Sequence, residues 1–311
     1  MKNVILFPGT DAVENPLIRV QAMSIIGVKE KIEETEQVIK KLFGEVIDLV
    51  SYMKAPNDLS VEGFRKLVFC SLATQVAIYD NYLVRNGKPD CVMGLSLGDV
   101  PRSVVSGLVS FEEGVRNLYL FTSMHALAGK GLCVHIKLEN TFDNSTELLQ
   151  LDKYQVHKSV IQNEKFGLIA GEESKMKRWI TEVAMTNNLN FRLMYPFPLH
   201  TELMSPVAKK LRPFVIKACD IQCMHTNIFS TVYGKLLKNN SDIINDCSLN
   251  ISAALDFPKA INNVIAHFGN EVRFVNIGPS DSLVKFLNHM DLPEDSSITD
   301  WFEKSLMNMA A

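Results

Sequence analysis

A serine between two glycines, in the segment GLSLG at residues 94–98, is the first candidate for chemistry in this sequence. The segment follows a short apolar run at residues 91–93 and precedes residues 104–124, whose apolar positions have helical spacing. A G-x-S-x-G pattern between a strand and a helix is typical of a nucleophile elbow, a sharp turn that exposes the serine oxygen. There the backbone N–H of Leu97 would point at a developing oxyanion. The alternative is an ordinary tight turn in which Ser96 only caps a helix.

A serine hydroxyl needs a base to take its proton, and the sequence offers seven histidines. His200 differs from the others because it follows Pro196 and Pro198, which stiffen its loop. The remaining histidines fall in predicted strands or helices, except His225, whose role stays undecided. Spacing alone leaves His200 as one candidate base among several.

Composition and charge exclude several classes of protein. The chain has 311 residues and a formal net charge of -3, which argues against a basic nucleic-acid-binding surface. No apolar run approaches the roughly 20 residues that span a bilayer, and the apolar N-terminal stretch is too short for a signal peptide. We therefore expect a cytoplasmic protein with no nucleic-acid or membrane partner.

The six cysteines indicate no disulfide framework and no metal site. They are scattered through mostly apolar surroundings, so we expect reduced, buried thiols. Cys219, Cys223 and His225 lie close together, but their spacing matches no strong zinc pattern.

The elements that would position the serine have the pattern of an α/β protein with a parallel-sheet core. Proline at position 101 would be costly inside a helix, so the helix after the elbow must begin late or be distorted there. Apolar runs predict strands at residues 4–7, 91–93 and 272–277. Helical spacing and capping residues predict helices at residues 29–43, 60–85, 110–127, 201–217, 258–268 and 282–287.

Residues 130–197 have a different pattern. Alternating apolar residues at 132–138 predict a half-exposed strand, and the segment continues with a short helix, two strands at 154–161 and 166–170, a helix, and a closing strand at 190–194. This strand–helix–strand–strand–helix–strand order is ferredoxin-like. We expect a small domain at 130–197 inserted in a larger one formed by 1–129 and 198–311.

Four separated motifs, in order, resemble the malonyl-CoA:acyl-carrier-protein transacylase family, which includes the acyltransferases of polyketide synthesis. FPGT at residues 7–10 resembles the family's FPGQ, and GLSLGD at 94–99 resembles GHSLGE. HTELMSP at 200–206 resembles HxxLMxP, and GPSDSL at 278–283 resembles GPxxxL. The resemblance spans nearly the whole chain.

The resemblance implies a hydrolase-like α/β core with Ser96 as nucleophile and His200 as base. It also implies an oxyanion hole built from the backbone N–H groups of Leu97 and Thr10. In this family a main-chain carbonyl orients the histidine, and the matching position here is Asn250, where the family usually has glutamine. That match depends on Phe257 standing in place of a family tryptophan.

The acyl pocket departs from the family pattern. Malonyl enzymes of the family carry an arginine twenty-five positions after the serine, where it pairs with the malonyl carboxylate. That position is Phe121 in this sequence, which predicts an uncharged acyl group because a buried carboxylate would be left unpaired. Leu95 and Leu199 make the predicted pocket more apolar, and His125, one turn after Phe121, lies on the same helix face. The alternative for His125 is a partly exposed helix histidine.

The resemblance therefore implies a free-standing acyltransferase that forms an acyl-Ser96 intermediate from acyl-CoA or an acyl-carrier-protein thioester. A carrier-protein phosphopantetheine thiol would accept the acyl group in polyketide or fatty-acid biosynthesis. No bound cofactor or metal is implied, and Lys209, Lys210 and Arg212 either dock the acidic carrier protein or form a solvated helix face.

Three alternatives stay open. One is a hydrolase that clears stalled acyl groups from the carrier proteins of a trans-acyltransferase polyketide synthase. Another is an inactive interaction module, which the presence of both Ser96 and His200 disfavours. The third, a general esterase, would need a catalytic acid that nothing in the sequence marks.

Overall fold

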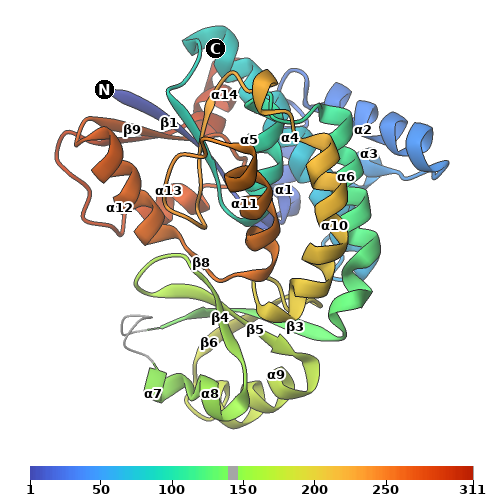
Figure 1. Ribbon diagram of the computed structural model, residues 1–311, viewed down its shortest axis with the longest axis vertical. Helices are drawn as coiled ribbons and strands as arrows, with labels where there is room; N and C mark the ends of the chain where they lie inside the picture. Colours follow the sequence, from blue (N-terminus) through green and yellow to red (C-terminus); the bar gives the residue numbers. More distant parts are fainter. Residues whose placement is uncertain (139–145, 311) are drawn as a thin grey trace.

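The computed structural model describes residues 1–138 and 146–310, which form two sheets with helices around them (Figure 1). The first sheet has the order β10-β9-β1-β2-β7 and is parallel throughout. Its strands are β1 (Lys2–Phe7), β2 (Cys91–Gly94), β7 (Asn227–Phe229), β9 (Val272–Asn276) and β10 (Ser297–Asp300). The predicted α/β class with a parallel-sheet core is confirmed.

Helices cover both sides of this sheet, which is why its central strands are apolar without alternation. The helices of this part are α1 (Pro16–Ala22), α2 (Val28–Phe43), α3 (Leu49–Tyr52), α4 (Val61–Asn86), α5 (Asp99–Val105), α6 (Phe111–Met124), α10 (Ser205–Ala218), α11 (Asn240–Ser252), α12 (Phe257–Phe268), α13 (Ser282–Leu287) and α14 (Trp301–Ala310). Capping signals placed several of them correctly: the Ser60 side chain accepts from the N–H of Gly63, and the Ser110 side chain accepts from that of Glu113.

Helix α4 is the longest helix of the described residues and runs through the core. Its length and composition would allow it to cross a membrane, contrary to the expectation that no such apolar run exists, but 78% of its most apolar window is buried inside the protein. Every residue from Leu67 to Tyr79 is buried, so other elements surround this part of the helix, as expected of a core helix.

The second sheet has the order β6-β3-β5-β4-β8. Its strands are β3 (Gly131–Lys137), β4 (His157–Ile161), β5 (Phe166–Glu172), β6 (Asn190–Tyr195) and β8 (Leu255–Asp256). Helices α7 (Thr146–Leu149), α8 (Leu151–Tyr154) and α9 (Glu173–Trp179) lie along one face, while α6, α10 and α11 lie on the other side (Figure 1).

Strands β3 to β6 pair antiparallel and carry helices in the predicted places, and their inner face packs a separate apolar cluster around Trp179. Residues 139–145 of the predicted inserted domain lie outside the described residues. The predicted boundaries at 129/130 and 197/198 stay a prediction.

Two local predictions were wrong. The strand expected from residue 154 begins at His157, because α8 extends to Tyr154 and Gln155 then takes a left-handed conformation with φ 52°. The helix expected from residue 201 begins at Ser205, after a short 3₁₀ turn at Glu202–Met204. This later start places Pro206 in the first turn, where a proline costs a helix nothing.

The elements that the sequence analysis missed include the strands β7, β8 and β10 and the helices α1, α3, α11 and α14. Strand β7 spans only Asn227–Phe229, and its apolar pattern is too short to recognise without its neighbour β2. Helix α11 has a weak apolar face, because several of its buried positions are polar, including Asp246 and Asn250.

Candidate active site

Ser96 occupies the predicted elbow, between β2 and α5. Its backbone has φ 57°, a left-handed conformation that costs a non-glycine residue free energy and recurs at nucleophile elbows. A Cβ at Gly98 would lie 2.0 Å from the carbonyl oxygen of Phe7, and one at Gly94 would lie 2.4 Å from the carbonyl carbon of Gly98. Both glycines are therefore needed for the chain to close this turn against β1.

The proline after the elbow follows the first of the two predicted routes, a late helix start. Residues Ser96–Gly98 form a 3₁₀ turn, and α5 begins only at Asp99. Pro101 thus falls in the first turn of α5, where its missing N–H has no partner to lose.

His200 lies against Ser96, as predicted. Its Nε2 is 2.6 Å from the Ser96 Oγ, and its Nδ1 is 2.5 Å from the main-chain oxygen of Asn250. A carbonyl oxygen can only accept, so Nδ1 carries the ring proton and Nε2 is free to accept the proton of the Ser96 hydroxyl. The expected orienting carbonyl at position 250 thus contacts the histidine directly.

Burial keeps the His200 ring neutral. Loss of water lowers its pKa to about 4, although the hydrogen bond to the Asn250 carbonyl opposes this shift. The imidazole is therefore in the form that can act as a base at neutral pH.

The loop that carries His200 is fixed at several points. His200 has φ 55°, and its N–H donates to the carbonyl of Ile251 at 3.1 Å. The neighbouring Leu199 carbonyl accepts from the hydroxyl of Ser159, on β4 of the second sheet, at 2.7 Å. The second sheet therefore helps to hold the histidine at the edge of the first.

The two amides predicted for the oxyanion hole lie next to Ser96. Thr10 and Leu97 are in the first turns of short 3₁₀ helices, where N–H groups have no partner within the helix. A Cβ at Gly9 would lie 3.5 Å from the Cβ of Ser96, so the FPGT loop approaches the serine closely. The Thr10 hydroxyl is occupied, since it accepts a hydrogen bond from the Tyr195 hydroxyl.

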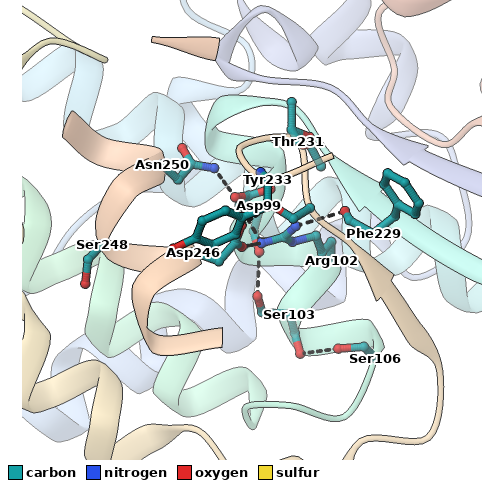
Figure 2. A network of polar contacts seen from close by, with 12 residues as sticks. Asp99, Arg102, Ser103, Ser106, Phe229, Thr231, Tyr233, Asp246, Ser248 and Asn250 are labelled. Carbon is teal, nitrogen blue, oxygen red and sulfur yellow. Dashed lines mark hydrogen bonds and ion pairs between the residues drawn. The ribbon is translucent and has the colours of Figure 1, made fainter. Parts of the chain in front are cut away.

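A second buried polar cluster, which we call the arginine network, lies beside this pair (Figure 2). Arg102 on α5 contacts Asp99 Oδ2 at 3.0 Å, pairs with Asp246 on α11, and donates to the Phe229 carbonyl at 3.2 Å. The Asn250 amide nitrogen donates to the same Oδ2 of Asp99. Burial raises the pKa of Asp99 well above its usual value, and Arg102 opposes that shift.

The sequence analysis did not identify the arginine network. One signal was present: an acid and a base three residues apart, Asp99 and Arg102, directly after the predicted elbow. Asp246 carried no local signal, because it reaches Arg102 from a helix 144 positions away.

A mainly apolar cavity opens beside Ser96 and His200, with a volume of about 960 Å³ including its open mouth. Phe121 and Leu199 line it, as predicted. Leu95 and His125 do not. Leu95 is buried in the core, while His125 contacts the Thr122 carbonyl through Nδ1 at 2.5 Å and packs edge-on against Phe197.

No candidate metal centre is present among residues 1–138 and 146–310, where no three His, Cys, Asp or Glu side chains converge. The cysteines are free, but the expectation that all are buried was wrong, because Cys223 is exposed.

No family model matches the chain. A malonyl CoA-acyl carrier protein transacylase of Bacillus subtilis (strain 168) is 26% identical over 311 aligned residues, which cover 92% of this chain and 90% of the relative. Probable polyketide synthase 27 of Dictyostelium discoideum is 24% identical over 279 residues, which cover 84% of this chain but only 10% of that protein.

Solved structures share the fold. MCAT from Streptococcus pneumoniae matches with a TM-score of 0.74 at 22% identity over 99% of each chain. A chain from the holo complex of a type II polyketide synthase acyl-carrier protein with its malonyl-transacylase matches with a TM-score of 0.79 at 18% identity, over 99% of this chain and 98% of that one. These matches show that the chain has the fold of malonyl-CoA:acyl-carrier-protein transacylases and polyketide synthase acyltransferase domains, and together with the four motifs around one cavity they support its assignment to that family.

Proposed function

We propose that this protein transfers an uncharged acyl group from an acyl-CoA or acyl-phosphopantetheine thioester to the thiol of an acyl carrier protein, through an acyl-Ser96 intermediate. The observation that carries the proposal is the chain of hydrogen bonds from Ser96 Oγ through the His200 ring to the Asn250 carbonyl, whose three residues line a mainly apolar cavity. The Bacillus subtilis relative is a malonyl CoA-acyl carrier protein transacylase, and one matching structure holds an acyl-carrier protein with its malonyl-transacylase, which supports the same reaction class here.

In the first half-reaction, Ser96 Oγ attacks the thioester carbonyl carbon while His200 Nε2 takes the hydroxyl proton. The carbonyl oxygen becomes an oxyanion, which the N–H groups of Thr10 and Leu97 stabilise. When the intermediate collapses, the carbon–sulfur bond breaks, and His200 returns its proton to the leaving thiolate. The products are acyl-Ser96 and a free thiol.

The second half-reaction runs the same steps in reverse with a new thiol. His200 takes the proton of the phosphopantetheine thiol, whose sulfur attacks the acyl-serine carbonyl. Ser96 then leaves with that proton. The step needs only the acceptor thiol and the groups already in the site, so no cofactor or metal enters the reaction.

The cavity favours an uncharged acyl group. Phe121 lies where malonyl enzymes of the family carry an arginine, and no lysine or arginine of the described chain lines the cavity. The acidic residue that does line it, Asp99, supplies no positive charge to pair with a malonyl carboxylate. A second carboxylate placed there would be buried without a cation, which is strongly unfavourable.

The acyl carrier protein would approach over the start of α10. Lys209 and Lys210 are exposed there, shortly after the His200 loop, and suit an acidic partner. Arg212, the third cation of this group, is half-buried and donates to the Asn245 side chain at 3.0 Å, so the two lysines remain as the docking residues.

Intact-mass spectrometry with acetyl-CoA, malonyl-CoA and an acyl carrier protein bearing butyryl tests the proposal. We expect an acetyl or butyryl adduct on the wild-type protein, no comparable malonyl adduct, and discharge of the adduct onto added carrier protein. Ser96→Ala should abolish the adduct. Ser123→Ala is the matched control, because Ser123 is exposed on α6 and its hydroxyl bonds only to the Tyr119 carbonyl.

Undiminished turnover by Ser96→Ala would refute the intermediate. Efficient labelling by malonyl-CoA would refute the role given to Phe121. Rapid appearance of free acid without transfer to carrier protein would instead assign the hydrolase activity.

A further inference from the structure

The cavity is much longer than an acetyl or butyryl group needs. Three residues of α10 and its C-terminal end, Leu211, Val215 and Cys219, line it at intervals of four, so they lie on one face of the helix. Eight residues of helix extend about 12 Å. On α6, the lining residues run from Phe121 back to Gly114, seven residues or about 10 Å.

These two helices define the direction of the cavity. His200 lies just before α10, and Phe121 lies in the last turn of α6, so these residues mark the reacting end. Near the opposite end, the N–H of Asp220, just after α10, donates to the Leu108 carbonyl at 2.9 Å and so ties the end of α10 to the segment before α6. The neighbouring Val109 lines the cavity and is buried.

Some of the polar groups along the cavity already have partners, whereas Asp99 Oδ1 and Asn117 Oδ1 have none among the described residues. The Ser103 hydroxyl donates to the Asp99 carbonyl at 2.7 Å, and Asp99 Oδ2 is held by Arg102 and Asn250. The remaining lining is mainly apolar, so the cavity favours a hydrocarbon chain over a polar substituent.

We propose that this cavity is an acyl channel for a medium-length saturated chain of about eight carbons, with its terminal methyl group near Val109 and Cys219. Carbon–carbon bonds of about 1.5 Å advance an extended chain by about 1.25 Å per carbon, so 10–12 Å of channel holds roughly eight to ten carbons. The inference rests on the proposed acyl-Ser96 chemistry and adds the length of the acyl group to it.

The test is a chain-length series of acyl-CoA thioesters with 2, 4, 8 and 12 carbons, followed as kcat/KM for Ser96 acylation by intact-mass spectrometry. Each methylene buried in an apolar site is worth a factor of a few in affinity. We expect octanoyl to react at least tenfold more efficiently than acetyl, and dodecanoyl to react less efficiently than octanoyl.

Two substitutions locate the chain in the channel. Val215→Phe fills the channel midway along α10, so it should lower the octanoyl-to-acetyl ratio at least tenfold. Cys219→Phe fills the far end, so it should suppress dodecanoyl more than octanoyl. Ile216→Phe is the matched control, since Ile216 is 49% exposed at the adjacent, outward position of the same helix. The octanoyl-to-acetyl ratio of this variant should equal that of the wild type.

The outcomes separate this inference from the proposed function. If no thioester of any length acylates Ser96, the proposed function fails. If acetyl and octanoyl react equally well and Val215→Phe leaves their ratio unchanged, the acyl channel is refuted while the acyl-serine chemistry stands. The wild-type series alone gives this answer if a variant fails to fold, which a thermal melt would show.

Discussion

Two buried polar clusters meet at Asn250, one made of uncharged groups and the other centred on an arginine. In the first, Ser96 and His200 carry no charge, and a main-chain carbonyl orients the histidine. In the arginine network, Arg102 lies between the carboxyl groups of Asp99 and Asp246. Asn250 connects them, because its carbonyl accepts from His200. Its side-chain amide donates to Asp99, as Figure 2 shows.

The two clusters differ because His200 must accept and return a proton, whereas the residues of the arginine network only hold the structure in place. A carboxylate hydrogen-bonded to His200 would stabilise the imidazolium and raise the pKa of the base. The carbonyl of Asn250 orients the ring with a smaller effect on that pKa. The nearest carboxyl group, Asp99, is instead held by Arg102, so it supports the elbow helix without contacting the histidine.

Removing the cation from the arginine network should have the largest effect on stability. Arg102→Met leaves two carboxyl groups buried without their partner, and we expect a loss of about 3–5 kcal/mol in the free energy of unfolding. The loss should grow as the pH rises, because burial raises the pKa of Asp99 and the folded variant must keep a proton on Asp99 that the unfolded chain releases. Urea denaturation at pH 5 and pH 8 measures both quantities.

Arg116→Met is the matched control for this change. Arg116 pairs with Glu113 at 3.0 Å on the partly exposed side of α6, where an ion pair contributes at most about 1 kcal/mol. Equal losses in the two variants would show that the buried network is no more important than a surface pair.

Asn250→Ala should uncouple the two clusters, with a smaller loss of stability than Arg102→Met. The main-chain carbonyl that orients His200 remains, but Asp99 loses a donor, so we expect a stability loss of about 1.5–3 kcal/mol and an acylation rate that falls less than in Ser96→Ala. The comparison is with Asn245→Ala, which makes the same change on α11 away from Asp99. A complete loss of acylation with a wild-type melting temperature would mean that the side chain, and not the carbonyl, serves the reaction.

The smallest expected effect is the change of the acylation rate with pH. His200 accepts a proton only when neutral, and its pKa of about 4 keeps it neutral far below the 6.5 of an ordinary histidine. At pH 5.5 the acylation rate should remain near its value at pH 7, whereas an unshifted histidine would lose about tenfold. An acidic limb near pH 6.5 in a protein that circular dichroism shows to be folded would contradict the buried, neutral base.

Much of the fold could be predicted from local sequence, because several elements carry their own signals. Glycine after α2 and serine before α4 and α6 mark helix ends through their backbone and capping chemistry. Elements whose identity depends on a distant partner were missed, and β7 and β10 are strands of this kind at the edges of the parallel sheet.

The residues of the candidate site also fall into those that local sequence signals identify and those that depend on distant parts of the chain. Local sequence was enough to single out Ser96 as the candidate nucleophile, because the glycines of the elbow and the serine between them form one local turn. His200, Asn250, Phe121 and Leu199 were expected from their motif positions, and the structure brings all four to the cavity. Only the tertiary structure could show that His125 and Leu95 point elsewhere and that Asp246 reaches Arg102, because side-chain direction and long-range pairing depend on how separate helices pack.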